Sequence, residues 1–111
     1  MTAPQENRED TAEVTITHHV QGQGGRYVAE IEGETHQGHL EWQPGDETKG
    51  DPVRVARTTV VPRPIGGRGI AALLVERMVE DAQREGFRIR PDCSYVEKKF
   101  DDNPDWADLR A

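Results

Sequence analysis

The chain has 111 residues and a net charge of −7, which suits one domain and excludes a general nucleic-acid binder, whose basic face would dominate the balance. It contains one cysteine, so it cannot form an intramolecular disulfide or a cysteine-based zinc cluster. No stretch approaches the roughly 20 apolar residues of a membrane span. We therefore expect no nucleic acid, metal or membrane among its partners.

The first 13 residues are polar and acidic, and they lack the apolar centre of a signal peptide. This composition predicts a disordered acidic tail over 1–13, followed by a single domain over 14–111. The same features predict a cytoplasmic protein.

The first half of the domain shows the alternation of apolar and polar residues that is typical of half-buried strands. Gly, Asp and Lys then dominate residues 44–51, which predicts a mobile loop. The predicted strands are 14–20, 26–32 and 36–43, with turns at 22–25 and 33–34.

A β-branched run between Pro52 and Pro62 predicts a further strand, over 53–61. A long amphipathic helix is predicted after it, because apolar residues recur at three- and four-residue spacing from Ile70 onward. Gly86 is a typical residue for the end of such a helix. One broad face of the helix is apolar and must pack on the sheet.

Three glycines, Gly66, Gly67 and Gly69, lie between this strand and this helix. Free backbone N–H groups and the positive end of the helix dipole meet at such a turn, which makes it a potential anion site. Residues 52–90 agree with this reading, since they carry eight arginines against four acidic residues. The alternative is a scaffold in which the glycines only turn the chain.

The C-terminal part predicts a short strand over 87–91 and two short helices. The first helix runs from Ser94 through Phe100, because Ser94 and Glu97 have the spacing of a capping box. The second helix follows Asn103, a preferred N-cap with proline after it. Together the elements predict an α+β fold with a mostly antiparallel sheet and a helix packed across it.

Cys93 is the candidate catalytic residue, because the start of a helix lowers the pKa of a thiol. It could be a nucleophile, an acyl carrier or a thiol that lines a pocket; the alternative is a small residue that fills space. Glu41 and His39 could act as bases, or could be ordinary exposed strand residues. His18 and His19 point to opposite faces of a strand, so they do not form a metal pair.

Several short motifs occur together in one order: Thr59-Val60-Val61-Pro62, Gly67-Arg68-Gly69-Ile70-Ala71, Pro91-Asp92-Cys93-Ser94-Tyr95-Val96 and Asn103-Pro104-Asp105-Trp106. With these motifs the chain resembles the small single-domain Gcn5-related N-acetyltransferase-like proteins over about residues 14–109. The resemblance implies that coenzyme A binds at the glycine turn through backbone amides, and that its pantetheine arm pairs with backbone between 58–62 and 88–92. The implied cofactor-binding residues are Val60, Val61, Arg63, Gly66, Gly67, Arg68, Gly69, Ile70 and Ala71.

The sequence departs from this family's pattern at two positions. Gly66 stands where the family usually has Arg or Gln, so that contact is missing or comes from Arg63 or Arg68. Thr58 stands where small members commonly have His. The resemblance implies an acetyl-CoA-dependent N-acetyltransferase, with Cys93 near the thioester.

The expected acceptor is an amine, such as a polyamine or a lysine side chain, because an acidic surface attracts cations. The alternative function is a non-catalytic module that binds coenzyme A or acyl-CoA and acts through a protein partner. We expect a monomer or a weak homodimer.

Overall fold

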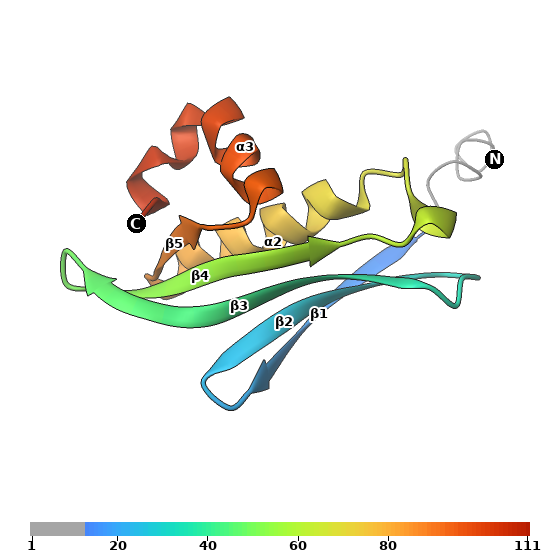
Figure 1. Cartoon of the computed structure of the whole chain (residues 1–111), viewed down its shortest axis with the longest axis horizontal. Coiled ribbons are helices and arrows are strands. Elements are labelled where there is room, and N and C mark those ends of the chain that lie inside the picture. Colours follow the sequence, from blue (N-terminus) through green and yellow to red (C-terminus); the bar gives the residue numbers. More distant parts are fainter. Residues whose placement is uncertain (1–12) are drawn as a thin grey trace, which may run out of the picture.

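The computed structural model describes residues 13–111, and the predicted tail lies outside them except for Glu13. The fold is α+β, as predicted: one sheet, a long central helix and short C-terminal helices (Figure 1). The strands are β1 Val14–Gln21, β2 Gly24–Ile31, β3 Gln37–Thr48, β4 Asp51–Val60 and β5 Arg88–Pro91. The α-helices are α2 Ile70–Glu85 and α3 Ser94–Asp102, and the 3-10 helices are η2 Arg63–Ile65 and η3 Pro104–Leu109.

The five strands lie in the sheet in chain order, β1-β2-β3-β4-β5. The first four are antiparallel, and β5 is parallel to β4 because α2 carries the chain back along the sheet. The end of the chain covers the outer edge of β5: Arg110 forms a parallel bridge with Ile89, and the N–H of Ala111 donates to the carbonyl of Ile89 at 2.8 Å.

One face of the sheet packs against α2, and we call it the inner face; the opposite side is the outer face. Tyr27, Leu40 and Trp42 point inward from β2 and β3 and are buried. Leu74 and Met78 meet them from the apolar stripe of α2. The alternation of apolar and polar residues predicted for these strands is confirmed by their burial. Figure 1 shows α2 behind the sheet, with α3 and η3 beside it near β5.

The central helix has the predicted bounds. It ends at Gly86, whose φ of 85° lies in the left-handed region, and the Gly86 N–H donates to the carbonyl of Ala82 at 2.9 Å. The apolar residue that opens it, Ile70, sits close to β3 because Gly38 lacks a side chain: a Cβ there would lie 3.0 Å from Ile70.

The loop predicted over 44–51 is wrong. β3 continues to Thr48 and β4 begins at Asp51, so only Lys49 and Gly50 form the turn, with φ of 53° and 84°. Positive φ at both central residues matches the right-handed twist of a hairpin. Pro44 is tolerated in β3 because the register with β2 ends at Trp42, which leaves this part of β3 at an edge.

The capping box predicted at Ser94 is also wrong. Cys93 occupies the N-cap position of α3, no side chain caps the helix, and Ser94 is its first helical residue. Asn103 precedes η3 as predicted, but its side chain donates to the carbonyl of Lys99 at 2.7 Å instead of capping. The last turn is a 3-10 helix, in which Trp106 packs edge-on against Phe100.

Candidate functional site

The glycine turn joins η2 to α2 and leaves the start of α2 uncapped. Gly67 and Gly69 both have a φ of 75°, a conformation that side chains rarely adopt, and a Cβ at either would meet nothing within 4 Å. Gly69 is the N-cap of α2, and within residues 13–111 no acceptor takes the N–H groups of Gly69, Ile70 or Ala71. Free donors at the positive end of a helix form an anion site.

The two arginines predicted to bind phosphate have different surroundings. Arg63 lies in η2, is exposed, and forms no ion pair within the described part of the chain. Arg68 lies in the turn, but its guanidinium donates to Glu34 at 3.1 Å. Gly66 has ordinary extended backbone, so its conformation does not require glycine. Arg63 is therefore the side chain that is free to meet an anion at this turn.

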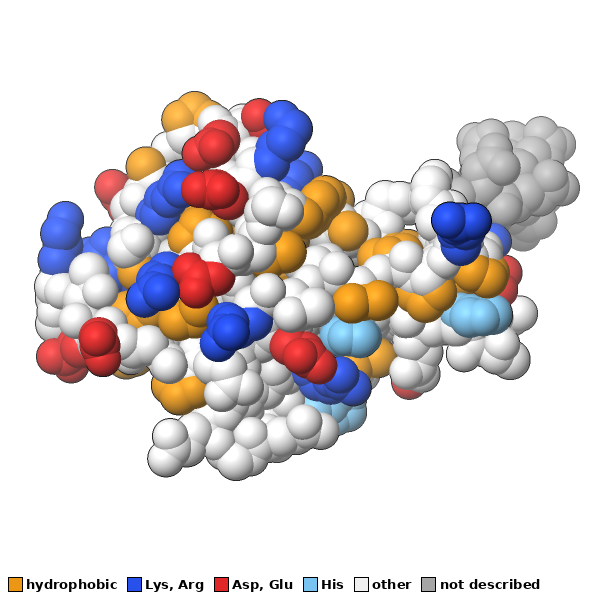
Figure 2. Space-filling model, viewed as in Figure 1, with side chains coloured by type: hydrophobic (Ala, Val, Ile, Leu, Met, Phe, Trp, Pro, Cys, Tyr) orange, Lys and Arg blue, Asp and Glu red, His pale blue; other side chains and the backbone are white. Residues whose placement is uncertain are grey.

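The strand that leads to the turn loses its partner before it ends. β4 pairs with β5 only from Val53 to Ala56, and the Ala56 carbonyl then accepts the N–H groups of Asp92 and Cys93 at 3.1 and 2.9 Å. The following residues, Arg57–Val60, have no strand beside them on this side; we call them the open edge. Figure 2 shows apolar surface exposed between β4 and the C-terminal helices.

A β-bulge in β4 occurs at the same place. Trp42 pairs with Ala56 and Glu41 pairs with Thr58, so Arg57 is the extra residue between them. Bulges redirect side chains and end regular pairing, and they are common next to active sites. The bulge and the end of the β4–β5 pairing together define where the open edge begins.

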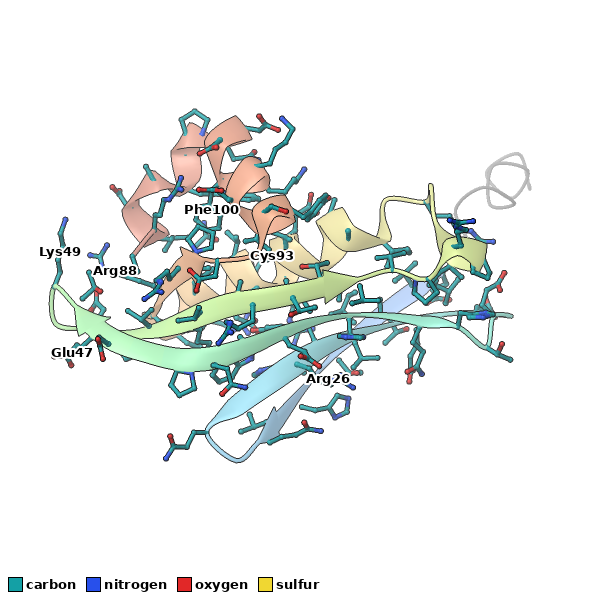
Figure 3. The ribbon with its side chains drawn as sticks, viewed as in Figure 1. Arg26, Glu47, Lys49, Arg88, Cys93 and Phe100 are labelled. Carbon is teal, nitrogen blue, oxygen red and sulfur yellow. The ribbon has the colours of Figure 1, made fainter. Side chains whose placement is uncertain are left out.

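Cys93 lies beside the open edge, at the start of α3 (Figure 3). Its sulfur is 3.5 Å from the Thr59 hydroxyl, to which the thiol donates. Burial raises the pKa of the thiol, but the Thr59 hydroxyl and the backbone of Val96 and Tyr95 together outweigh it, so that the pKa lies below its ordinary value. The Cys93 thiol is partly exposed, and it loses its proton more readily than an ordinary cysteine.

Exposed apolar side chains border the same region. Val60 on the open edge is 40% exposed, Leu73 in the first turn of α2 is 38% exposed, and Tyr95 at the start of α3 is 36% exposed. Tyr95 on α3 lies near Glu76 on α2, one turn beyond Leu73, because α2 and α3 are in contact. Burial and the charge of Glu76 raise the pKa of Tyr95. Such a surface suits a ligand with apolar parts.

The two candidate bases lie on the outer face of the sheet. Glu41 accepts from Arg26 at 2.5 Å across the β2–β3 pair, and His39 Nε2 is 3.7 Å from the same carboxylate oxygen. Figure 2 shows acidic, basic and histidine side chains gathered over this part of the face, and Figure 3 shows Arg26 away from Cys93. His39 and Glu41 therefore lie one strand away from the open edge, on the face opposite to Thr59 and Cys93.

The other two strand histidines do not converge, as predicted. His18 points inward, where its ring stacks on Tyr27 with centroids 4.3 Å apart and its Nε2 accepts from Trp42 at 3.0 Å. His19 points outward and contacts Thr17 at 2.9 Å. Among residues 13–111 no three His, Cys, Asp or Glu side chains are arranged to hold a metal ion. None of the helices within the described residues is long and apolar enough to cross a membrane.

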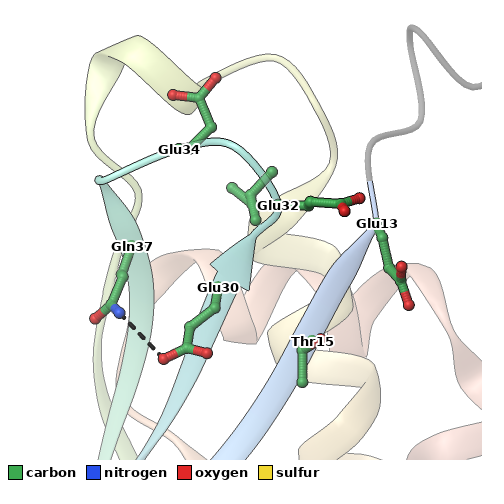
Figure 4. Close-up of a pocket in the computed structure, with 7 residues that line it drawn as sticks. Glu13, Thr15, Glu30, Glu32, Glu34 and Gln37 are labelled. Atoms are coloured by element: carbon green, nitrogen blue, oxygen red, sulfur yellow. Dashed lines mark hydrogen bonds between the residues drawn. The ribbon is translucent and has the colours of Figure 1, made fainter.

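A separate cavity of about 410 Å³ lies where β1 begins and β2 ends (Figure 4). Glutamates dominate its lining, and they would repel the phosphates of a nucleotide. Of the residues at the glycine turn, none lines the cavity, although Glu34 on its wall pairs with Arg68. It is therefore not the anion site. Its lining residues are Glu13, Thr15, Glu30, Ile31, Glu32, Glu34 and Gln37.

A sequence profile of the GCN5-related N-acetyl-transferase family matches residues 26–109, which is well over half of the chain. The chain belongs to this family. The match begins in β2 and runs through the open edge, the glycine turn and α3 into η3. Membership in the GCN5-related N-acetyltransferase family supports acetyl transfer as the general chemistry of this domain. No curated protein matched the chain.

Sequence reasoning missed three features of this candidate site: the bulge at Arg57, the contact between Thr59 and Cys93, and the pairing of Arg68 with Glu34. Each joins residues that are far apart in the chain or depends on the register of two strands. No local pattern in the sequence signals them. The glycine turn and Cys93, in contrast, were predicted from local patterns. The open edge leads to the glycine turn and lies beside Cys93.

Proposed function

We propose that this protein binds acetyl-CoA at the glycine turn and the open edge, and transfers the acetyl group to an amine. The observation that carries the proposal is the uncapped start of α2, where the N–H groups after the left-handed Gly69 have no acceptor within the described residues. A pyrophosphate supplies acceptors of the required charge. The family match supports the same chemistry.

The residues present fit the diphosphate of coenzyme A. Gly67 and Gly69 have open space where a Cβ would be, so an anion can approach the backbone closely. Arg63 adds a free guanidinium, and Arg68 can add a second one if it exchanges Glu34 for phosphate. Ile70 is buried, so it and Ala71 would contribute through their backbone N–H groups.

The open edge fits the amide-containing pantetheine arm. Its free backbone groups can pair with those amides as a neighbouring strand would. Val60 belongs to this edge, and Val61 continues it as a partly buried residue that packs on the core. The region predicted for the arm, 58–62 opposite 88–92, needs one correction: β5 is paired through Pro91, so Asp92 and Cys93 begin the opposite side.

Cys93 would line the end of this path, where the acetyl group is carried. Its lowered pKa and its contact with Thr59 suit a group that exchanges a proton with a sulfur leaving group, and direct transfer to the amine does not require it to be acylated. The expected acceptor is a polyamine or a lysine side chain, which the net charge of −7 would attract.

The cofactor site can be tested by calorimetric titration of acetyl-CoA into Gly69→Glu. The carboxylate should lower the affinity by about 100-fold, equivalent to about 2.7 kcal/mol, because it occupies the anion site. Gly86→Glu is a matched control: its φ of 85° is also left-handed and its Cβ position is also open, but it lies at the other end of α2. Equal loss in both variants, or no binding to the wild type, would overturn the proposal.

Transfer is tested separately by measuring release of the coenzyme A thiol with a panel of amines, in the wild type and in Cys93→Ser. We expect turnover that the serine variant reduces while it retains acetyl-CoA affinity. Binding without turnover on any amine would instead support the non-catalytic module that acts through a protein partner.

A further inference from the structure

We propose that the acceptor amine approaches the open edge from the outer face of the sheet, and that His39 takes its proton there. Glu41 positions the His39 ring, and Arg26 compensates the charge of Glu41. The inference rests on the proposed function. It assigns the missing base and the side of the sheet from which the acceptor enters.

The register of the strands places these residues in two rows of cross-strand neighbours that end at the open edge. On the outer face one row of cross-strand neighbours ends at Thr58, the first paired residue after the bulge, and the next row ends at Val60. Both end residues belong to the open edge. The first row is His19, Arg26, Glu41 and Thr58, and the second is Thr17, Val28, His39 and Val60.

The two sides of the open edge have different roles. The inner side carries Thr59, which pairs with the buried Leu40 and contacts Cys93. The helices α2 and α3 close this side, so it suits the arm of the cofactor. The outer side has no helix over it in the described structure, and it is the side from which an acceptor can reach a thioester held at the edge (Figure 1).

Two groups that can accept a proton lie one strand away from the open edge on the outer face, and they are not equivalent. Glu41 is already engaged by Arg26 at 2.5 Å. The His39 ring has no hydrogen bond within residues 13–111, its Nε2 lies 3.7 Å from Glu41, and its side chain is 25% exposed. A free imidazole beside a fixed carboxylate is suited to take a proton, because the carboxylate stabilises the imidazolium that forms.

The charged groups around His39 agree with this assignment. Its own strand contributes Glu41, and β2 contributes Arg26 and, in the next row, Glu30. The neighbouring strand β4 contributes two uncharged side chains on this face and the exposed, bulged Arg57. Arg26 and Glu41 neutralise each other, so the site can accept a neutral amine and hold the proton it loses.

The proposed step is balanced. The lone pair of the amine nitrogen forms the C–N bond to the acetyl carbonyl carbon as the C–S bond breaks, and the sulfur leaves as thiolate. The proton lost by nitrogen moves to His39 Nε2 and then to solvent, and the thiolate takes a proton in turn. The products are an amide and the free thiol of coenzyme A, with the enzyme unchanged.

The location of His39 can be tested without turnover. The chain has four histidines, whose ring signals in a ¹H–¹³C spectrum can be assigned by single substitutions. Saturating acetyl-CoA should shift the His39 signal, while the signal of His19, on the far edge strand β1, should stay in place. A His39 signal that does not respond to bound acetyl-CoA would overturn the inference.

The role of His39 is tested with lysine, spermidine and butylamine as acceptors. His39→Gln should lower kcat/KM by about 100-fold, remove the acid limb of the pH profile and leave the acetyl-CoA affinity unchanged. Glu41→Gln should lower kcat less, with Glu41→Asp partly restoring it, as expected of a positioning residue. His36→Gln is the control, and circular dichroism checks the fold of each variant.

The outcomes separate this inference from the proposed function. Failure of the wild type to bind acetyl-CoA overturns the proposed function itself. Binding and transfer with an unchanged pH profile in His39→Gln, or with equal losses in His39→Gln and His36→Gln, overturns only the role of His39. Bound acetyl-CoA without transfer to any of the three amines overturns the catalytic step and the role of His39 with it.

Discussion

The polar groups at the two ends of α2 differ in whether they have hydrogen-bond partners. Near its C-terminus Asp81 is 1% exposed and accepts hydrogen bonds from Tyr27 at 2.8 Å, from Arg77 at 3.2 Å and from Arg84. At its N-terminus the backbone donors after Gly69 have no acceptor within the described residues. One end holds the helix to the sheet, and the other end keeps its donors free.

This difference separates a stabilising network at one end of α2 from the proposed cofactor site at the other end. Burial raises the pKa of the Asp81 carboxyl, but the hydrogen bonds from Tyr27, Arg84 and Arg77 outweigh it, and the pKa is lowered. Burial, together with Asp81, raises the pKa of the Tyr27 hydroxyl. Within residues 13–111 no buried side-chain N or O atom lacks a partner. The Asp81 network therefore leaves none of its buried side-chain atoms unsatisfied, whereas the free donors at the other end of α2 are backbone N–H groups.

The largest effect is expected from Asp81→Ala. It leaves the buried Tyr27 hydroxyl without its acceptor and two arginines without their shared carboxylate, which should cost about 3 kcal/mol of unfolding free energy. Urea unfolding measures this loss, and acetyl-CoA affinity should be retained under conditions where the variant is folded. The comparison between the two ends would fail if Asp81→Ala weakened binding as strongly as Gly69→Glu.

Asp102→Ala serves as the control for this prediction. Asp102 forms an exposed i,i+4 pair with Lys98 at 3.3 Å, with exposed fractions of 53% and 75%. Such pairs contribute about 0.5 kcal/mol or less. A control that cost as much as Asp81→Ala would show that burial is not what gives Asp81 its importance.

A smaller effect is expected from His18, which packs on the same network. The pKa of His18 lies below its ordinary value of 6.5, mainly because the ring is buried and secondly because of the charge of Arg54. As the pH falls, the unfolded chain therefore binds the His18 proton before the folded chain does, so stability is fully present above 6.5 and declines as the pH falls toward the folded pKa.

Two variants test this pH dependence by urea unfolding at about pH 7.5 and about pH 5. His18→Gln and His18→Phe should each lose about 1 kcal/mol at the higher pH, because the Trp42 N–H loses its acceptor or keeps a poorer one. Both should lose less than the wild type between the two pH values. The prediction is contradicted if their pH dependence equals that of the wild type.

The smallest effect is expected from Thr59→Val. Removing the hydroxyl that contacts the Cys93 sulfur should raise the pKa of the thiol toward its ordinary value of 9.0 and slow its alkylation by iodoacetamide at neutral pH. The rate as a function of pH gives the pKa. Thr15→Val, an exposed threonine on β1, is the control. Unchanged alkylation of Thr59→Val would mean that the backbone of α3 alone controls the thiol.

Much of the fold could be predicted from local patterns. The helix over 70–85 and its end at Gly86 were correct, because a three- to four-residue apolar period and a left-handed glycine depend only on nearby residues. The loop over 44–51 was wrong because Lys49-Gly50 is a weak turn signal and the strand residues around it gain their pairing from the partner strand. The capping box predicted at Ser94 was wrong because Cys93, whose N–H donates to the carbonyl of Ala56, takes the N-cap position.

The sequence by itself determined the glycine turn before an amphipathic helix, the inner faces of the strands and the position of Cys93 after a short strand. These features follow from residue spacing and from the conformations that glycine allows. Only the tertiary structure decided that β4 parts from β5 at Ala56, that Thr59 meets Cys93 and that His39 and Glu41 lie beside Val60 and Thr58 on the outer face. These depend on strand register and on a bulge, which are set by pairing between distant segments.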